Sequence, residues 1–191
     1  MGFFDKLKNE AAAAVSGAVK QAAVNAVSKT EKIVFPDLPE SMEAFKALPQ
    51  AALSTPFDTA ALAVAAFCLF PANKELCYEM IDFLRGPRPM TGIDKQFISD
   101  RFRDKDYVPR SYFEGATPAN NYIPTEPYTI TVKTGAHSYE QEGYVKLFLT
   151  SGGADDPRPI TLRSKGSQWY LWEYSSVLLG VKTPAEADPW A

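Results

Sequence analysis

The sequence is poor in the side chains that most often carry catalysis and metal binding. Among its 191 residues there are one histidine and two cysteines. A multi-histidine metal site has almost no ligands to draw on, and any histidine-based catalytic pair would have to use His137, which falls in a predicted hairpin loop. Two cysteines are too few for a disulfide framework. Cys68 and Cys77 lie in apolar helical segments, so we expect buried, reduced thiols.

Motifs of the common enzyme classes are missing as well. The sequence has no Gly-x-Gly-x-x-Gly, Walker loop, Gly-x-Ser-x-Gly or His-Glu-x-x-His motif, and no Cys-x-x-Cys. Their absence argues against the common dinucleotide, nucleotide, hydrolase and zinc classes. We therefore assign no catalytic residue, no metal ligand and no cofactor, and the sequence favours a protein without enzymatic activity.

Long hydrophobic runs and an excess of positive charge are also lacking. The longest purely apolar run, Ala60–Phe70, is shorter than the roughly 18 residues that a membrane-spanning helix needs. Charged residues interrupt the N-terminal segment, which is unlike a secretory signal, so we expect a cytoplasmic protein. The formal net charge of −3 provides no overall positive field, and we expect no nucleic-acid partner.

Residues 1–29 are predicted to form an alanine-rich amphipathic helix. Alanine has the highest intrinsic helix propensity, and Phe4, Leu7 and Val15 fall on one face with several alanines. The apolar face is thin, which favours close packing through residues 3–29 on a protein partner, a second copy or the chain's own domain. Binding to a membrane surface is the less favoured alternative, because few large apolar side chains are available to insert.

The remaining chain divides into a helical half and a strand half. We expect an extended linker over residues 30–39 and a single α+β domain over residues 40–191. Capping patterns and 3.6-residue periodicity predict four helices, the second of which is apolar all round and therefore central. These helices cover Glu40–Leu48, the segment after Thr55-Pro56 up to Pro71, the segment from Asn73 to Gly86-Pro87, and the segment after Thr91, with Ile93, Phe97, Ile98 and Phe102 facing inward.

After residue 127 the apolar period changes from 3.6 to 2, which indicates strands. Helices followed by strands favour an α+β fold in which the helical N-terminal half packs on a C-terminal antiparallel meander sheet of four to five strands. A hairpin turn is expected at Ser164–Ser167. The expected strands lie around Tyr128–Val132, Tyr144–Leu149, Ile160–Leu162, Gln168–Tyr174 and, as the optional fifth, Val177–Val181.

Residues 107–127 fit neither period and contain four prolines and three tyrosines. Long loops in compact domains are often functional, although coverage of a sheet edge by the aromatic side chains explains the composition equally well. If the protein has a ligand site, we expect it where this loop crosses the sheet. The expected ligand-binding residues are Arg110, Tyr112, Tyr122, Arg158 and Trp172.

Two further patterns bear on recognition. Alternation along residues 169–174 places Trp169 and Leu171 on one face and Tyr170, Trp172 and Tyr174 on the other, which indicates either covered faces or an aromatic recognition surface. Folding back of Trp190 would cover one face. Arg85–Arg110 contains seven basic and four acidic residues. It could bind a phosphate or an acidic partner, but the interleaved acids favour a self-neutralised, solvated helix face.

Several runs of the second half resemble a known family. They are Pro109–Phe113, Glu126–Tyr128, Ser151–Asp155, Pro157-Arg158, Trp169–Glu173 and Asp188–Ala191. With them, residues 34–191 or so resemble an uncharacterised bacterial domain family of unknown function, found mainly in Gram-positive anaerobes. The resemblance implies an intracellular bacterial protein, and it transfers no functional residue.

These features favour a non-catalytic binding or interaction module that is assembled through its N-terminal helix. One alternative is an enzyme that uses carboxylate and tyrosine chemistry in a pocket under the 107–127 loop, with Glu114, Glu126 or Glu173 as general acid or base. The other is a peripheral membrane protein recruited by residues 1–29.

Overall fold

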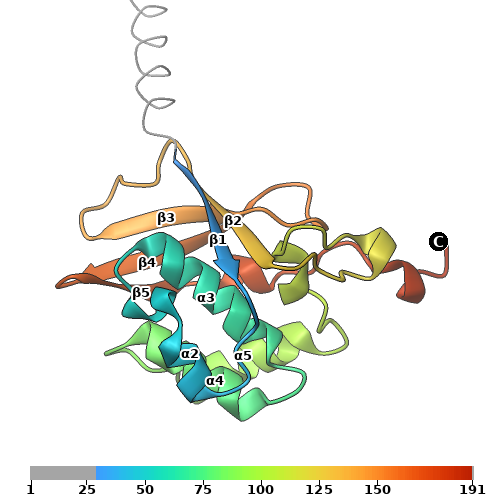
Figure 1. The fold of residues 1–191 in the computed structure, drawn as a ribbon, viewed down its shortest axis with the longest axis horizontal. Helices are drawn as coiled ribbons and strands as arrows, with labels where there is room; N and C mark the ends of the chain where they lie inside the picture. The colour runs from blue at the N-terminus through green and yellow to red at the C-terminus, as the bar shows by residue number, and fades with distance from the viewer. Residues whose placement is uncertain (1–28, 191) are drawn as a thin grey trace, which may run out of the picture.

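The computed structural model describes residues 29–190, which form a sheet layer and a helical layer (Figure 1). The sheet has five strands in the order β1-β2-β3-β4-β5, and every neighbouring pair is antiparallel. The predicted α+β class and meander sheet are therefore confirmed. The strands are β1 (Thr30–Phe35), β2 (Tyr128–Thr134), β3 (Tyr144–Leu149), β4 (Arg158–Lys165) and β5 (Gln168–Glu173).

The expected linker over residues 30–39 is wrong in its first half, because Thr30–Phe35 is edge strand β1. It pairs with β2 over its whole length, from Thr30 opposite Lys133 to Phe35 opposite Tyr128. Ile33 and Phe35 alternate with exposed residues and are buried against the helices. The sequence before the prolines therefore contains a short alternation of apolar and polar residues, which is typical of a strand. The fifth strand thus comes from the N-terminal side of the helices.

The expected strand at Val177–Val181 is also wrong. The segment forms a 3₁₀ helix, η4 (Ser175–Leu178), in which Val177 and Leu178 are buried. These apolar side chains contribute to the core from a helical turn, and a pair of adjacent apolar residues does not distinguish that arrangement from a buried strand.

The four predicted helices are present in the described chain, and each begins at a side-chain cap. Helix α3 is central: ten of its thirteen residues are buried and it contacts all five strands. Its all-round apolar sequence predicted this position. The helices are α2 (Met42–Ala47), α3 (Pro56–Cys68), α4 (Lys74–Arg85) and α5 (Gly92–Phe102), capped by Ser41, Thr55, Asn73 and Thr91.

Three details of the predicted packing can be compared with the structure. Cys68 and Cys77 are free thiols, as expected; Cys77 is buried as expected, whereas Cys68 is only half-buried. Ile93, expected to face inward, is 83% exposed because it lies in the first turn of α5, ahead of the buried Ile98 and Phe102. Trp190 is 93% exposed and covers no face of the sheet.

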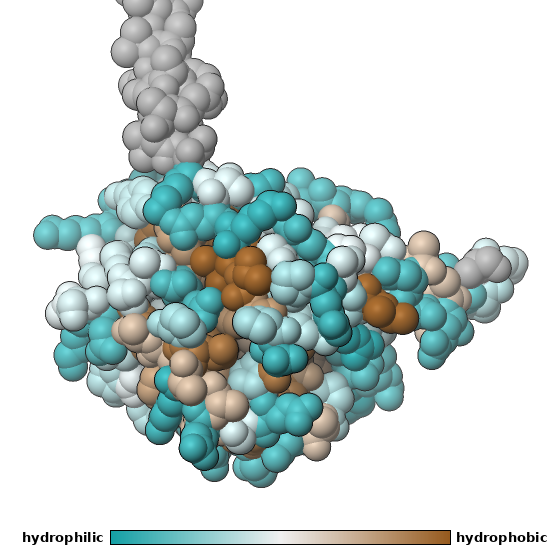
Figure 2. All heavy atoms as spheres, in the orientation of Figure 1, coloured by the Kyte–Doolittle hydropathy of each residue, from teal (hydrophilic) through white to brown (hydrophobic). Residues whose placement is uncertain are grey.

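The surface of the molecule is mostly polar in the view of Figure 2, with apolar side chains gathered where β1 crosses the helical layer. Across residues 29–190, no helix combines the length and apolar character needed to cross a bilayer. The predicted helix over residues 3–29, and with it the expected contact with a partner, copy or membrane, falls outside the described residues except for Lys29.

The hydroxyl group of Thr59, on α3, forms a hydrogen bond between the helical layer and edge strand β5. Thr59 is fully buried, and its Oγ1 donates a hydrogen bond to the backbone oxygen of Trp169 at 2.8 Å, while the Trp169 N–H donates to the Leu53 oxygen at 2.9 Å. These bonds satisfy the outer edge of β5 at Trp169, which would otherwise present unpaired backbone groups.

Thr59→Val should lower the free energy of unfolding by about 1–3 kcal/mol, because the isosteric methyl group leaves the partly buried Trp169 oxygen without its hydroxyl donor. Urea denaturation followed by circular dichroism measures the change. Thr183→Val, at an exposed position, is the matched control. Equal stability of the two variants would contradict a structural role for the Thr59 hydrogen bond.

Candidate functional site: the Arg–Trp cleft

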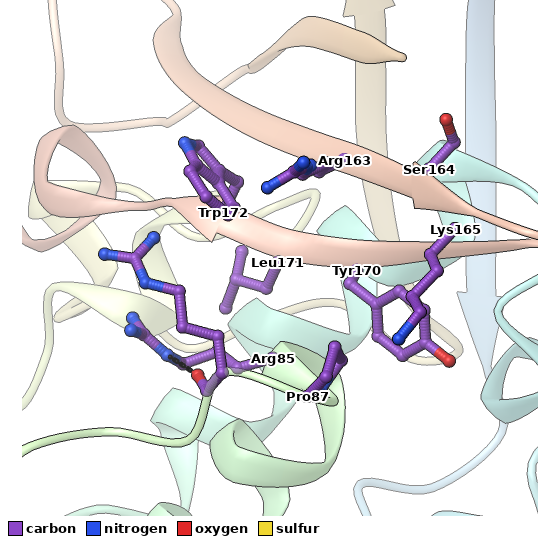
Figure 3. A pocket seen from close by; sticks show the side chains of 9 residues that line it. Arg85, Pro87, Arg163, Ser164, Lys165, Tyr170, Leu171 and Trp172 are labelled. Carbon is purple, nitrogen blue, oxygen red and sulfur yellow. Dashed lines mark hydrogen bonds between the residues drawn. The ribbon is translucent and has the colours of Figure 1, made fainter.

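A cleft of about 440 Å³ lies at the β5 edge of the sheet, between strands β4 and β5 and the turn that follows α4 (Figure 3). We call it the Arg–Trp cleft. Its volume is within the range of small-molecule sites. It is lined by Arg85, Pro87, Arg88, Arg163, Ser164, Lys165, Tyr170, Leu171 and Trp172.

A glycine brings the turn against the sheet edge. Gly86 ends α4 with a φ of +58°, and its N–H donates to the carbonyl oxygens of Asp82 and Phe83. The ring of Tyr170 packs so closely on this backbone that a Cβ at Gly86 would stand 2.3 Å from Cε1 of the ring. Only glycine fits both the positive φ and the close approach, so the sequence Gly86-Pro87 builds one wall of the cleft.

Arg85 is the buried cation of the cleft, with only 4% of its surface exposed. Its Nε donates to the backbone oxygen of Arg88 at 2.9 Å, and its Nη1 donates to the hydroxyl of Tyr174 at 3.4 Å. Its Nη2 lies 3.7 Å from a carboxylate oxygen of Asp94. Buried arginine requires such partners, and together they fix the guanidinium and the turn that carries Arg88.

Asp94 connects this cation to the start of α5. Its carboxylate accepts hydrogen bonds from the N–H and the hydroxyl of Thr91, at 2.7 and 2.8 Å, in a capping box. Burial alone would raise the pKa of Asp94. The Thr91 hydrogen bonds and the charges of Arg85 and Arg88 outweigh burial, and the pKa lies below its usual value. Asp94 therefore stays ionised beside Arg85 at neutral pH.

Trp172 is placed in the cleft by an irregularity of β5. The register passes from Leu162–Leu171 to Thr161–Glu173, which makes Trp172 the extra residue of a β-bulge. The guanidinium of Arg88 lies 4.4 Å from its ring centroid and that of Arg163 lies 4.7 Å away. Both contacts are within the range of cation–π attraction.

Arg163 is held from a second side by the sheet. It lies opposite Tyr144 on β3 and opposite Tyr170 on β5, and its guanidinium is 5.2 Å from the Tyr144 ring centroid. Tyr144 and Trp172 also meet edge to face at 5.5 Å. The half-buried rings therefore restrict the position of an exposed guanidinium.

The cleft is cationic because its charges are incompletely neutralised. Among the described residues, no ion pair involves Arg88, Arg163 or Lys165, and no carboxylate lines the cleft. Asp94 and Glu173 instead line a smaller adjoining hollow of about 150 Å³, which also contains Arg85. The arrangement can bind an anionic group with several N–H donors above an apolar floor.

The five residues expected to bind a ligand do not come together in one cavity. Trp172 lines the Arg–Trp cleft, whereas Arg110 and Tyr122 line a cavity of about 470 Å³ beside the 107–127 loop. Tyr112 lines a third cavity of about 380 Å³, and Arg158 donates to the backbone oxygen of Gly180 at 3.3 Å. The expected residues of the 107–127 loop lie away from Trp172 because the loop runs beside β2, where Phe113 forms an antiparallel β-bridge with Ile130.

The two expected tyrosines of the loop make hydrogen bonds that hold the C-terminal segment. Tyr112 is 1% exposed and donates to the Val177 oxygen at 2.9 Å, and the fully buried Tyr122 donates to the Lys182 oxygen at 2.5 Å. Burial raises the pKa of Tyr122 to about 12.

The 107–127 loop contains two 3₁₀ turns, η2 (Pro109–Tyr112) and η3 (Pro118–Asn120).

Glu114, one of the carboxylates considered for an enzyme, lines the cavity of Tyr112. Hydrogen bonds from Lys32 and Thr131, at 3.2 and 2.9 Å, lower the pKa of its carboxyl group. Glu126 accepts a hydrogen bond from the hydroxyl of Tyr128 at 3.2 Å, and Glu173 accepts one from the N–H of Ser175 at 2.8 Å.

Among the described residues, no group of three or more histidine, cysteine or acidic side chains is arranged to hold a metal ion.

Sequence reasoning missed most of the cleft. Arg85 and Arg88 were part of the basic segment interpreted as a solvated helix face, but both belong to the end of α4 and its turn. The Gly86-Pro87 stop was the available signal that this segment leaves the helix. The contribution of Arg163 and Lys165 depends on the β4–β5 register, which periodicity alone does not give.

Asp94→Asn should make the free energy of unfolding depend less steeply on pH in the acid range. The folded-state pKa of Asp94 is below the unfolded value of about 4, so its ionised form stabilises the fold above that pH and the contribution is lost as pH falls through the folded pKa. The free energy of unfolding, measured in urea at pH 6 and pH 3, should therefore drop less in the variant than in the unmodified chain. Asp156→Asn, at an exposed position, should keep the original drop; an equal drop in all three would contradict the role of Asp94.

Comparison with known proteins gives a family and no activity. No curated protein and no solved structure matches the chain. Residues 37–185, which include α2 to α5, β2 to β5 and the whole Arg–Trp cleft, match the family model of a domain of unknown function. Because this match covers well over half of the sequence, the chain belongs to the DUF6935 family, a domain of unknown function.

Proposed function

We propose that the protein is a non-catalytic binding module that takes an anionic ligand in the Arg–Trp cleft. The observation that carries the proposal is the convergence of Arg85, Arg88, Arg163 and Lys165 on one apolar cleft that no carboxylate of the described chain lines. Cations of this kind are the usual recognition groups for carboxylates and phosphates.

The positions of the guanidiniums support binding. Trp172 holds Arg88 and Arg163 by cation–π contact, and Arg85 is fixed by the Arg88 oxygen and the Tyr174 hydroxyl. A side chain that is already ordered loses less conformational freedom when a ligand arrives. Pro87, Leu171 and the Tyr170 ring add apolar surface, so the ligand would carry an apolar part beside its anionic group.

The acid–base groups give less support to the enzyme alternative. In the cavity beside Tyr112, hydrogen bonds from Lys32 and Thr131 lower the pKa of Glu114, whereas a general acid or base is most effective with a pKa near the working pH. The cleft itself contributes cations and a tyrosine whose hydroxyl donates to Gln168 at 2.7 Å. These groups suit anion recognition better than proton transfer.

We also propose the wider setting that the sequence favours. The module would act in the cytoplasm of a bacterium and be brought to a protein partner, or to a second copy, through residues 3–29. The cleft would then serve as its ligand-binding site and the N-terminal segment as its means of assembly.

The proposal predicts that the full chain binds hexanoate and discriminates against hexanamide, because only the carboxylate can accept charged N–H donors. Chemical shifts of the Trp172 indole N–H, followed by NMR during titration at pH 7, measure both affinities. Arg163→Gln should weaken hexanoate binding about fivefold, the equivalent of roughly 1 kcal/mol for a lost charged hydrogen bond.

Arg103→Gln removes the same charge from an exposed arginine that pairs with Asp100 and does not line the cleft. It should leave hexanoate binding unchanged. Binding of hexanoate and hexanamide with equal affinity, or equal loss in both arginine variants, would overturn the assignment of the cleft as an anion site.

A further inference from the structure

The cleft presents positive charge at two separated places, and we infer from this that its ligand is a small organic dianion with one anionic group at each end of a short apolar chain. The inference rests on the proposed function and makes it more specific. A ligand with one anionic group would use only one end of the cleft and leave the other cation unmatched.

The first end is formed around Trp172. Arg88 and Arg163 contact the Trp172 ring, and the guanidinium of Arg85 lies in the adjoining hollow that Trp172 and Arg88 also line. Arg85 is shared with Asp94, whereas the described structure shows no carboxylate paired with Arg88 or Arg163. The two exposed guanidiniums offer planar donor pairs that match a carboxylate or a phosphate.

The second end is formed by Lys165. Arg163 and Lys165 are two residues apart on β4, so their side chains leave the same face of the strand about 7 Å apart. In Figure 3 Lys165 runs alongside the Tyr170 ring, while Arg163 lies beside Trp172 at the other end of the cleft. As with Arg88 and Arg163, no ion pair of the described chain occupies the Lys165 ammonium.

The floor between the two ends is apolar. Leu171 and Pro87 lie between the Trp172 end and the Lys165 end (Figure 3), and the Tyr170 ring is pressed against Gly86. An apolar floor favours methylene groups over a hydroxylated or charged spacer, since burial of polar atoms without partners costs free energy. The backbone spacing of Arg163 and Lys165 along β4 and the apolar floor beside them together match an aliphatic α,ω-dicarboxylate of a few methylene groups.

The contacts that the Trp172 ring already makes argue against a ligand whose planar base or sugar stacks on this ring. The guanidiniums of Arg88 and Arg163 already lie 4.4 and 4.7 Å from the ring centroid, and the Tyr144 ring also meets it in an edge-to-face contact. Stacking would have to displace one of these contacts. The ring therefore acts as a support for the cations, and the ligand meets the guanidiniums.

The experiment compares hexanedioate with hexanoate, which differ in a second carboxylate at equal chain length. NMR titration of the full-length chain at pH 7 and fixed ionic strength should give at least fivefold tighter binding of hexanedioate. Butanedioate, with a shorter spacer, should bind less tightly than hexanedioate. Lys165→Gln should reduce hexanedioate affinity to that of hexanoate and leave hexanoate affinity unchanged.

Lys105→Gln is the control, because Lys105 is an exposed lysine that does not line the cleft. It should preserve the preference for the dianion. Equal affinity for hexanedioate and hexanoate, or a preference that survives Lys165→Gln, would overturn the dianion inference and leave the anion site standing. Failure of every carboxylate to bind would overturn both.

Discussion

The packing of the Tyr170 ring on the backbone of Gly86 joins the helical layer to the edge of the sheet, and the geometry of the Arg–Trp cleft depends on it. It sets the turn after α4 beside β5 at a distance that no side chain at position 86 would allow. The contact thereby brings Arg85 and Arg88, from the helical layer, to the same cleft as Arg163 and Trp172, from the sheet. Neither layer alone contains the site.

The cations of the cleft differ in how deeply they are buried, and their partners differ accordingly. The buried Arg85 has Asp94 and the Tyr174 hydroxyl as partners, because an unpaired cation in that position would be costly. The more exposed Arg88 and Arg163 rest against Trp172, and Lys165 extends beside Tyr170. Thus the innermost cation stabilises the turn, whereas the outer cations keep their donors available to a ligand.

Local sequence signals predicted the helices well. Thr55-Pro56 and Thr91 to Asp94 are cap patterns whose hydrogen bonds form within a few residues, so they do not depend on the rest of the fold. The apolar length of α3 predicted its central position for a similar reason, since a helix that is apolar all round must be covered on every side.

Long-range pairing limited the prediction of both the fold and the site. Thr30–Phe35 is a strand because β2, almost a hundred residues later, pairs with it, and the local sequence resembles an extended linker. Of the expected ligand residues, only Trp172 lines the Arg–Trp cleft, where the β5 bulge sets its position. Tyr112 and Tyr122 were expected to bind a ligand, and in the structure their hydroxyls donate to backbone oxygens of the C-terminal segment.

The central claim is that the guanidiniums of Arg88 and Arg163, which both contact the Trp172 ring, form one anion-binding unit. The most direct test is an NMR spectrum of the arginine Nε–Hε groups, assigned by single Arg→Lys variants and recorded with and without hexanedioate. Shifts of the Arg88 and Arg163 signals together, with an unmoved Arg103 signal, are the result that the structure predicts. Unchanged signals for both at saturating ligand, or shifts spread equally over the arginines of the surface, would contradict it.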